Sequence, residues 1–431
     1  MKTSKKSNSN NKESSLFKAG LLFMFFSAIV SVMNYLYHLF MGRMLGPHDY
    51  GVLGSLFAII YIVTFATSTF NLVISKQVAE FKGKNQLGKI KKLINLSMKR
   101  TAIAGIFGMV LFILATPFIA DFMNIESYSG IILVGVIAYA SFLSVLLSGA
   151  LNGMQKFVSQ NISSFTSVFL KLGVAIFLVW LGYSVNGALG AIVLGTAAGM
   201  FIAYLPLRSQ LKNSKEESID LKKSYRFAVP VFFASMFAIF LITLDQILVK
   251  HYFSSEQAGI YAAAGNIAKI IWFGSSFLIA PLFPKIVESK AKGKNTSNLL
   301  TKSLIYISVI IFAGCAMYFI APTFIVNLLY GSQYLAAVPL IGMFGLALGI
   351  FSLLQILMTY NLAIEKYGFI YIFLAGIIAE VAGIYMFHSN LGEIVKIILI
   401  TNLAVLVSCI IYNKNDILGD LNNLKLFSFA R

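Results

Sequence analysis

Four charged residues lie inside long apolar runs, where an uncompensated charge is costly. Two are bases, Lys171 in VFLKLGVAIF and Lys269 in AAAGNIAKIIWF. Two are acids, Asp245 in ITLDQILVK and Glu380 in GIIAEVAG. A Lys, Arg or Asp at the centre of a bilayer costs about 2.5–3.5 kcal/mol on insertion scales, so such groups usually face protein or water and mark transport pathways. These four are therefore candidates for a binding or coupling site.

The bases have the chemistry to hold an anion. Lys171 and Lys269 could attract a phosphate-bearing head group, or each could snorkel or pair with a nearby carbonyl or acid. Arg43 and Lys250 are expected at the outer ends of spans, where a base could orient an anionic head group or cap a helix against its dipole. Lys76, at a cytoplasmic end, could meet an incoming pyrophosphate or be an ordinary flanking lysine.

The acids have the chemistry to bind a small cation. A buried carboxylate can take up and release H⁺ or Na⁺, so Asp245 and Glu380 are candidates for ion coupling. Asp245 could equally be the salt-bridge partner of one of the lysines. Asparagines within or beside spans could bond sugar hydroxyls or a neighbouring helix; they are Asn34, Asn71, Asn161 and Asn266.

Other chemistries have little support. The histidines have no paired spacing, so no metal site is predicted; they are His38, His48, His251 and His388. No Gly-rich loop followed by Lys-Ser/Thr is present, which argues against an ATPase, and nothing predicts a cofactor. A membrane glycosyltransferase or polysaccharide polymerase should show an exposed acidic pair or a large outer loop, and neither is expected here. The sequence thus predicts a protein that is not an enzyme.

The elements that must position these residues are membrane spans. Of the 431 residues, 58% are apolar and only 12% charged, and the mean hydropathy is +0.83. Because a span needs about 20 apolar residues, we expect an all-α integral membrane protein. The hydropathy pattern predicts twelve spans, near 17–41, 51–75, 101–120, 130–151, 159–182, 186–207, 228–250, 258–283, 299–320, 334–358, 367–387 and 393–412.

The basic residues predict the orientation of these spans. The net charge is +18, and 29 of the 34 Lys and Arg residues fall in the two tails and in alternate connections between spans. Since Lys and Arg concentrate in cytoplasmic loops, we expect a plasma or inner membrane protein with both termini in the cytoplasm. The basic charge then reflects topology, and nucleic acid is not an expected partner. Within one basic connection, the apolar spacing in 86–98 predicts a helix lying on the membrane surface.

An internal repeat relates the two halves of the chain. GRMLGPHDYG, 42–51, aligns without gaps with KHYFSSEQAG, 250–259, at an offset of 208 residues. The same offset places AEFKGK, 79–84, on VESKAK, 287–292. Because 208 residues cover six spans, the halves have the same orientation, and their pseudo-two-fold axis should run along the membrane normal. The chain therefore predicts two six-helix bundles with a cleft between them.

The repeat shows that Lys269 has no basic counterpart in the other half. Its equivalent at the offset of 208 is Tyr61, so this cation is present in only one half and is not demanded by symmetric packing.

The repeat also predicts the domain organisation. The predicted parts are a basic cytoplasmic tail 1–16, a first half 17–207, a cytoplasmic linker 208–227, a second half 228–412 and a C-terminal tail 413–431.

The repeated segments also carry a resemblance to a known family. GRMLGPHDYGVLGSLFAI, which begins at Gly42, resembles the signature of the polysaccharide transporter family of the multidrug/oligosaccharidyl-lipid/polysaccharide (MOP) exporter superfamily. LDQILVKHYFSSEQAGIYAAAGNIAKI, 244–270, is similar to that family's seventh and eighth spans. The resemblance implies a flippase that moves lipid-linked oligosaccharide (polyprenyl phosphate or pyrophosphate) to the outer leaflet by alternating access, for cell-surface polysaccharide or glycan assembly. Its implied partners are that lipid, membrane lipids, glycan-assembly proteins and, if transport is coupled, H⁺ or Na⁺.

The main alternative is an ion-coupled multidrug or cation antiporter of the same superfamily. Such a protein should line its cavity with acids for a cationic cargo. The mid-span bases Lys171 and Lys269, and a first span without acids, favour an anionic cargo instead.

Overall fold

The fold is all-helical, as expected. The computed structural model describes residues 3–219, 225–279, 281–292 and 296–421, and within them the regular elements are α-helices and one 3₁₀ segment. The helices are α1 Thr3–Gly83, α2 Leu87–Met123, α3 Tyr128–Gly153, α4 Phe157–Trp180, α5 Ser184–Leu211, α6 Tyr225–Phe240, α7 Leu244–Tyr252, α8 Ser255–Ile279, α9 Leu282–Ala291, α10 Ser297–Ile320, α11 Pro322–Leu329, η2 Ser332–Ala337, α12 Val338–Ile364, α13 Phe369–Met386, α14 Leu391–Tyr412 and α15 Lys414–Leu421.

The helix lengths agree with about twelve membrane spans. Among the described residues, ten helical stretches are long and apolar enough to cross a bilayer. One of them, Phe26–Gly83, has 58 residues, or about 87 Å of helix at ~1.5 Å per residue, far more than the ~30 Å of hydrocarbon. It therefore holds two spans. Helix α8, which has 25 residues and carries Lys269, is not among these ten stretches.

Two helix breaks shape these spans. In α1 the helix is interrupted at Gly46, whose φ of 71° lies in the left-handed region that glycine adopts most easily, and Pro47 then opens the second segment. The predicted span 228–250 is also broken, because α6 ends at Phe240 and α7 begins at Leu244. This second break places Asp245 in the first turn of α7.

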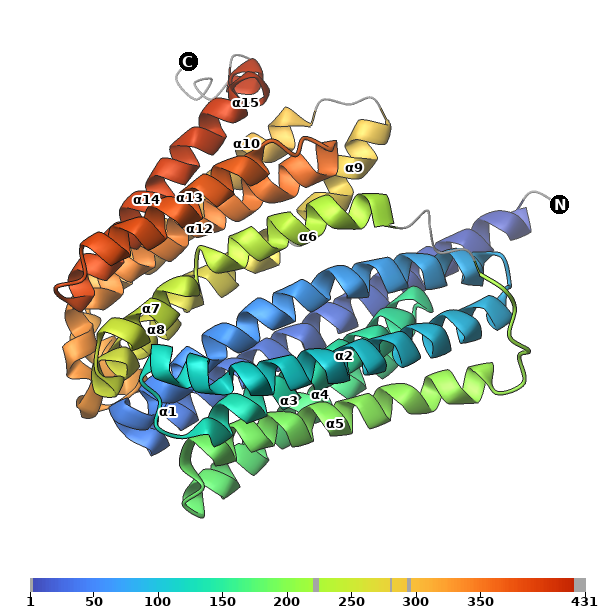
Figure 1. Ribbon diagram of the computed structural model, residues 1–431. Coiled ribbons are helices and arrows are strands. Elements are labelled where there is room, and N and C mark those ends of the chain that lie inside the picture. The colour runs from blue at the N-terminus through green and yellow to red at the C-terminus, as the bar shows by residue number, and fades with distance from the viewer. Residues whose placement is uncertain (1–2, 220–224, 280, 293–295, 422–431) are drawn as a thin grey trace. The chain divides into compact units, whose positions relative to one another are not determined.

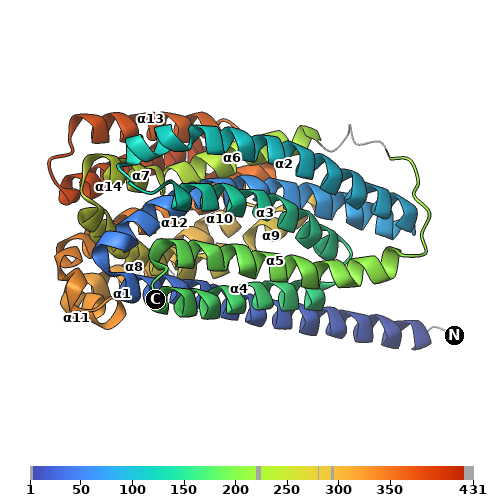
Figure 2. The ribbon, with the colours of Figure 1, turned by 60° about the horizontal axis from the view of Figure 1, so that its bottom comes forward.

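The chain forms two compact units, each described by itself. Unit 1 comprises Met1–Leu45 and Val63–Ala228; unit 2 comprises Gly46–Ile62 and Val229–Arg431. In unit 1, α2 to α5 run side by side, and the N-terminal part of α1 lies along α4 (Figures 1 and 2). In unit 2, α12 is the central helix and packs on α8, α10 and α14; most of the side chains in its span are buried.

Within unit 2, the two copies of the repeated loop pack on each other. A Cβ added to Gly51 would lie 1.8 Å from the carbonyl oxygen of Ser255, and one added to Gly259 would lie 1.8 Å from that of Pro47. Pro47 and Ser255 are themselves equivalent at the offset of 208, so the contact is reciprocal, as in a two-fold interface. Only a residue without a side chain permits this approach of the second segment of α1 to α8.

The second pair of repeated segments, 79–84 and 287–292, also makes matching contacts. Glu80 and Glu288 each pair with the lysine four residues later, Lys84 and Lys292. Lys82 donates to the carbonyl of Met154 at the end of α3, and its equivalent Lys290 donates to the last carbonyl of α12, 3.0 Å away. A lysine in each copy thus caps the C-terminus of a neighbouring helix. The internal repeat is confirmed in these contacts.

The prediction of a separate surface helix at 86–98 is wrong. These residues form the start of α2, which continues unbroken into the membrane span. The apolar side chains Ile90, Leu93 and Ile94 are buried in the core of unit 1, where they meet residues of the second segment of α1, α3 and α5. The helical spacing was read correctly, but the apolar face meets protein and not lipid.

Part of the predicted linker lies along this same turn of α2. Lys92 forms a 2.8 Å salt bridge with Glu216, and Asn95 donates a hydrogen bond to the same carboxylate. The bond from Lys92 holds the pKa of Glu216 below its usual value. Lys91 donates to the carbonyl of Ser214. The linker therefore runs back over unit 1 before the chain enters unit 2.

We predict that Gly51→Ala and Gly259→Ala each lower the midpoint of thermal unfolding of the purified protein. The new methyl group would overlap a backbone carbonyl, and overpacking of this kind costs about 1–3 kcal/mol. Gly274→Ala is the matched control, because it lies in α8 and nothing stands within 4 Å of its added Cβ. Equal midpoints for all three variants would contradict the contact.

Candidate functional site

Lys171 lies in unit 1 against the first segment of α1. Its ammonium donates a hydrogen bond to the side-chain oxygen of Asn34 and lies 4.7 Å from the centroid of the Tyr37 ring. Tyr37 is fully buried, and its hydroxyl donates to the carbonyl of Ala188, 2.9 Å away, which fixes the ring. The lysine is therefore held by an amide and an aromatic face.

Small residues on α5 set the position of Lys171. A Cβ added to Gly195 would lie 2.4 Å from the carbonyl oxygen of Ser167, one turn before Lys171 on α4. One turn further along α5, the carbonyl of Gly199 accepts a 2.7 Å hydrogen bond from Ser163. Such close approach through glycine is typical of helix crossings in membranes. It fixes α4 on α5 and leaves Lys171 facing α1.

Lys269 has a similar environment in unit 2. Its ammonium lies 3.3 Å from the side-chain oxygen of Asn266 and 5.0 Å from the centroid of the Tyr61 ring. Asn266 in turn donates to the hydroxyl of Tyr50, 2.8 Å away, and Tyr50 bonds Tyr330. Tyr61 is the repeat equivalent of Lys269, so these two equivalent positions touch.

The two lysines have no acidic neighbour at contact distance among the described residues. Within the described residues, neither Lys171 nor Lys269 forms a salt bridge. An amide oxygen and a ring face stabilise an ammonium group without neutralising it, a cation–π contact contributing about 0.5–2 kcal/mol. Each lysine therefore has the electrostatics of an anion-attracting group.

The acids lie together in unit 2. Asp245 and Glu380 are 5% and 1% exposed, and the Tyr261 hydroxyl donates to one oxygen of Asp245, 2.7 Å away. The charges of the two carboxylates interact with each other, and that of Asp245 interacts with Lys269. The other Asp245 oxygen and both Glu380 oxygens are buried without a hydrogen-bond partner in the described part of the chain.

This arrangement is suited to binding a proton or a small cation. Buried carboxylate oxygens without partners are costly, and a proton or a bare monovalent ion would satisfy them. Asp245 also lies in the first turn of α7, at a break within a membrane span, a common setting for ion sites. Sequence reasoning missed the break, although Thr243 two residues before Asp245 is a usual helix-start signal.

The three remaining bases lie in different environments. Arg43 and Lys76 are exposed and belong to unit 1. Lys250 is only 1% exposed and occupies the last turn of α7, where its charge meets the negative end of the helix dipole. Its burial matches the helix-capping role and leaves no exposed amine for a head group.

The predicted residues are divided between the two units. Lys269 and the acids Asp245 and Glu380 share unit 2, whereas Lys171 belongs to unit 1. Of the four asparagines, Asn34 and Asn266 lie at the two lysines. Asn71 instead accepts a 3.5 Å bond from Asn152 on the neighbouring helix α3, and Asn161 is buried.

Comparison with known proteins gives the family. The sequence model of a family described as "Polysaccharide biosynthesis protein" matches residues 17–290. The chain belongs to this polysaccharide biosynthesis protein family. A comparison with curated proteins finds no match.

Several solved structures have the same fold as this chain, although their sequence identity to it is low. The inward-facing conformation of a multidrug resistance MATE transporter of the MOP superfamily is 14% identical, with a TM-score of 0.75 over 92% of this chain and 96% of that one. The lipid II flippase MurJ in an inward closed conformation is 13% identical, with a TM-score of 0.68 over 94% and 91%. A MOP superfamily transporter from Pyrococcus furiosus is 16% identical, with a TM-score of 0.60 over 94% and 96%. The predicted fold class is confirmed: an all-α membrane protein with the MOP transporter fold.

Proposed function

We propose that this protein is a flippase that moves a lipid-linked oligosaccharide from the cytoplasmic to the outer leaflet. The observation that carries the proposal is the pair of mid-span lysines, Lys171 and Lys269, each held by a tyrosine ring and an asparagine amide and neither joined to an acid in the described chain. A phosphate or pyrophosphate linkage is the anion that such dispersed cations would attract. Membership of the polysaccharide biosynthesis protein family and the fold shared with a lipid II flippase support this substrate class.

In this proposal the cargo divides between two environments. Lys171 and Lys269 each attract the phosphate-linked head group, and Asn34 and Asn266 each offer an amide to sugar hydroxyls. The polyprenyl tail stays in the lipid, because about 0.8 kcal/mol per buried CH₂ opposes its entry into a polar path. Arg43 and Lys76, both exposed, receive or release the head group at the ends of the path, and Lys250 caps α7. Each single contact is weak enough to allow release.

The protein is proposed to act in the plasma membrane with both termini in the cytoplasm, where 29 of its 34 basic residues would then lie. The enzymes that build the lipid-linked sugar on one side and polymerise or transfer it on the other are its expected functional partners. A drug antiporter remains the second candidate, since the acid pair of Asp245 and Glu380 and the fold shared with MATE transporters fit cation-coupled export.

The acid pair is proposed to couple transport to an ion. Asp245 and Glu380 together present three buried carboxylate oxygens that have no partner among the described residues, and Tyr261 of α8 donates its hydroxyl to Asp245. Entry of H⁺ or Na⁺ would relieve the repulsion between the carboxylates and weaken the attraction of Asp245 for Lys269. With the ion bound, Lys269 would be free to hold a head group. Without the ion, Asp245 would compete with the head group for Lys269.

We predict that the purified protein accelerates the movement of a fluorescent polyprenyl-pyrophosphate oligosaccharide across liposomes, and that Lys171→Met and Lys269→Met each slow it about tenfold or more. Loss of one charge-assisted hydrogen bond is worth about 1.5–3 kcal/mol, and each 1.4 kcal/mol is a factor of ten. The rate is followed by adding a membrane-impermeant quencher. Lys396→Met, an exposed lysine at the start of α14, should transport at the wild-type rate.

Thermal unfolding of the same variants separates a binding role from a structural one. Since neither lysine has an acidic partner at salt-bridge distance, methionine of similar length removes only one hydrogen bond and one ring contact, and the unfolding midpoint should fall only slightly. A marked fall in the midpoint would make the lysines structural. Export of cationic dyes without movement of the lipid would replace the flippase with the antiporter.

We also predict that Asp245→Asn and Glu380→Gln abolish the dependence of transport on an ion gradient. Neutral amides cannot release a proton and bind Na⁺ weakly, so the rate should no longer respond when a Na⁺ or a pH gradient is imposed on the liposomes. Glu126→Gln, an exposed acid, is the control and should respond as wild type does. Gradient dependence retained in both acid variants would place the coupling site elsewhere.

A further inference from the structure

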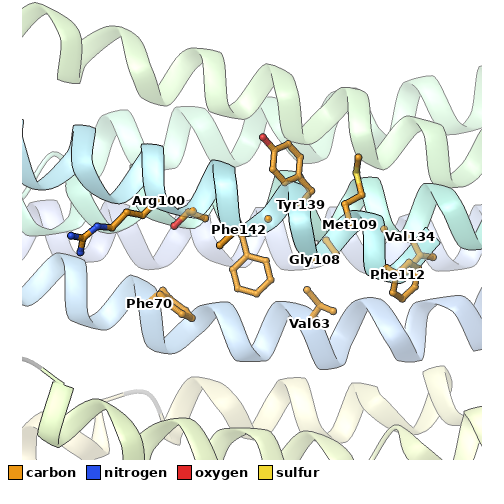
Figure 3. A pocket seen from close by; sticks show the side chains of 14 residues that line it. Val63, Phe70, Arg100, Gly108, Met109, Phe112, Val134, Tyr139 and Phe142 are labelled. Carbon is orange, nitrogen blue, oxygen red and sulfur yellow. The ribbon is translucent and has the colours of Figure 1, made fainter. Parts of the chain in front are cut away.

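Unit 1 carries a groove that is lined by none of the residues proposed for the flippase. It is a groove between the second segment of α1, α2 and α3, with a volume of about 440 Å³. Figure 3 shows its side chains in a row, with the guanidinium of Arg100 at one end. Most of the lining is apolar and aromatic, including Phe70, Gly108, Phe112, Val134, Tyr139 and Phe142.

The length of this groove matches one leaflet of a bilayer. From Arg100 to Phe112 the groove follows 12 residues of α2, or about 18 Å at ~1.5 Å per residue. The hydrocarbon core is ~30 Å thick, so the groove reaches slightly beyond its middle from the Arg100 end. Glycine keeps it open: nothing lies within 4 Å of a Cβ added to Gly108. A single acyl chain of one leaflet fits this depth, whereas a long polyprenyl chain does not.

A more polar cavity continues the groove at the Arg100 end. It has a volume of about 170 Å³, shares Phe70, Arg100 and Thr101 with the groove, and adds Gln77 and Ser97. The Gln77 side chain is 7% exposed, and its amide oxygen has no hydrogen-bond partner in the described chain. A buried acceptor of this kind calls for a donor from a ligand or a water molecule.

The charge at the junction of the two cavities is positive. Arg100 is the one charged residue among the described residues that line them. No hydrogen bond or salt bridge joins its guanidinium to another described residue, and Figure 3 shows it at the end of the row of lining side chains, so its five N–H donors are available to a ligand there. A guanidinium matches the geometry of a phosphate oxygen pair.

We infer that this groove binds an anionic phospholipid of the cytoplasmic leaflet, with its phosphate on Arg100, a head-group hydroxyl donating to Gln77 and one acyl chain along Gly108. The cytoplasmic side follows from the position of Arg100 at the basic end of α2. The phospholipid is not the cargo, and the inference stands whether or not the protein is a flippase.

The test is native mass spectrometry of the purified full chain, titrated with phosphatidylglycerol and with phosphatidylcholine of the same acyl chains. Phosphatidylglycerol should bind more tightly, and Arg100→Gln should weaken it about tenfold, the value of one charge-assisted contact. Lys99→Gln is the matched control, since Lys99 is equally exposed and lines neither cavity. Equal affinity for the two lipids, or equal weakening by the two substitutions, would overturn the site.

A second pair of variants tests the groove itself. Gly108→Leu should fill the groove and lower phosphatidylglycerol binding, whereas Gly173→Leu, an exposed glycine on α4 with similarly open surroundings, should not. Unchanged binding in Gly108→Leu would place the lipid elsewhere. Displacement of phosphatidylglycerol by an equal amount of polyprenyl phosphate would make the groove a site for the cargo tail and would overturn the phospholipid assignment.

Discussion

The cost of placing a charge in hydrocarbon is the constraint on which the rest of this structure depends. Lys171, Lys269, Asp245 and Glu380 all lie in segments that cross the membrane, and each must find protein groups in place of water. The two lysines find an amide oxygen and a tyrosine face. Of the acids, Asp245 accepts a hydrogen bond from Tyr261, and three carboxylate oxygens of the two acids have no partner among the described residues. This difference between the bases and the acids is the reason for proposing a cargo role for the bases and an ion role for the acids.

Close packing of small residues makes this arrangement possible. Gly51 and Gly259 let the second segment of α1 cross α8 with backbone in contact with backbone. Tyr61 and Lys269 lie further along the same two helices. Like Gly51 and Gly259, they are equivalent positions of the repeat, 208 residues apart. Residues that are equivalent under a two-fold axis touch only where they lie close to that axis. The contact of Lys269 with Tyr61 within unit 2 therefore joins a cation from one copy of the repeat to a ring from the other.

Much of the fold could be predicted from the sequence, because hydropathy, basic loops and the repeat are properties of single segments. The repeat even identified Tyr61 as the equivalent of Lys269. The sequence could not show that the two residues touch, since it does not fix which faces of the helices meet. The break before Asp245 was missed because an apolar run hides a helix end, and Ile90 was assigned to lipid because an amphipathic face looks the same against lipid or protein. From the sequence, Arg100 was one of the basic residues that predict topology, because the cavities beside it form only in the folded chain.

The most direct test of the central claim is restoration of the charge at Lys269 by chemistry. Lys269→Cys is made in a chain whose two buried cysteines, Cys315 and Cys409, are replaced by alanine. Its transport is measured before and after reaction with aminoethyl methanethiosulfonate or with the neutral hydroxyethyl analogue. Mass spectrometry confirms that modification is complete. The account predicts that the cysteine variant is slow, that the aminoethyl group restores transport and that the neutral group does not. Equal recovery with both reagents, or no recovery after complete aminoethyl modification, would contradict a role for the positive charge.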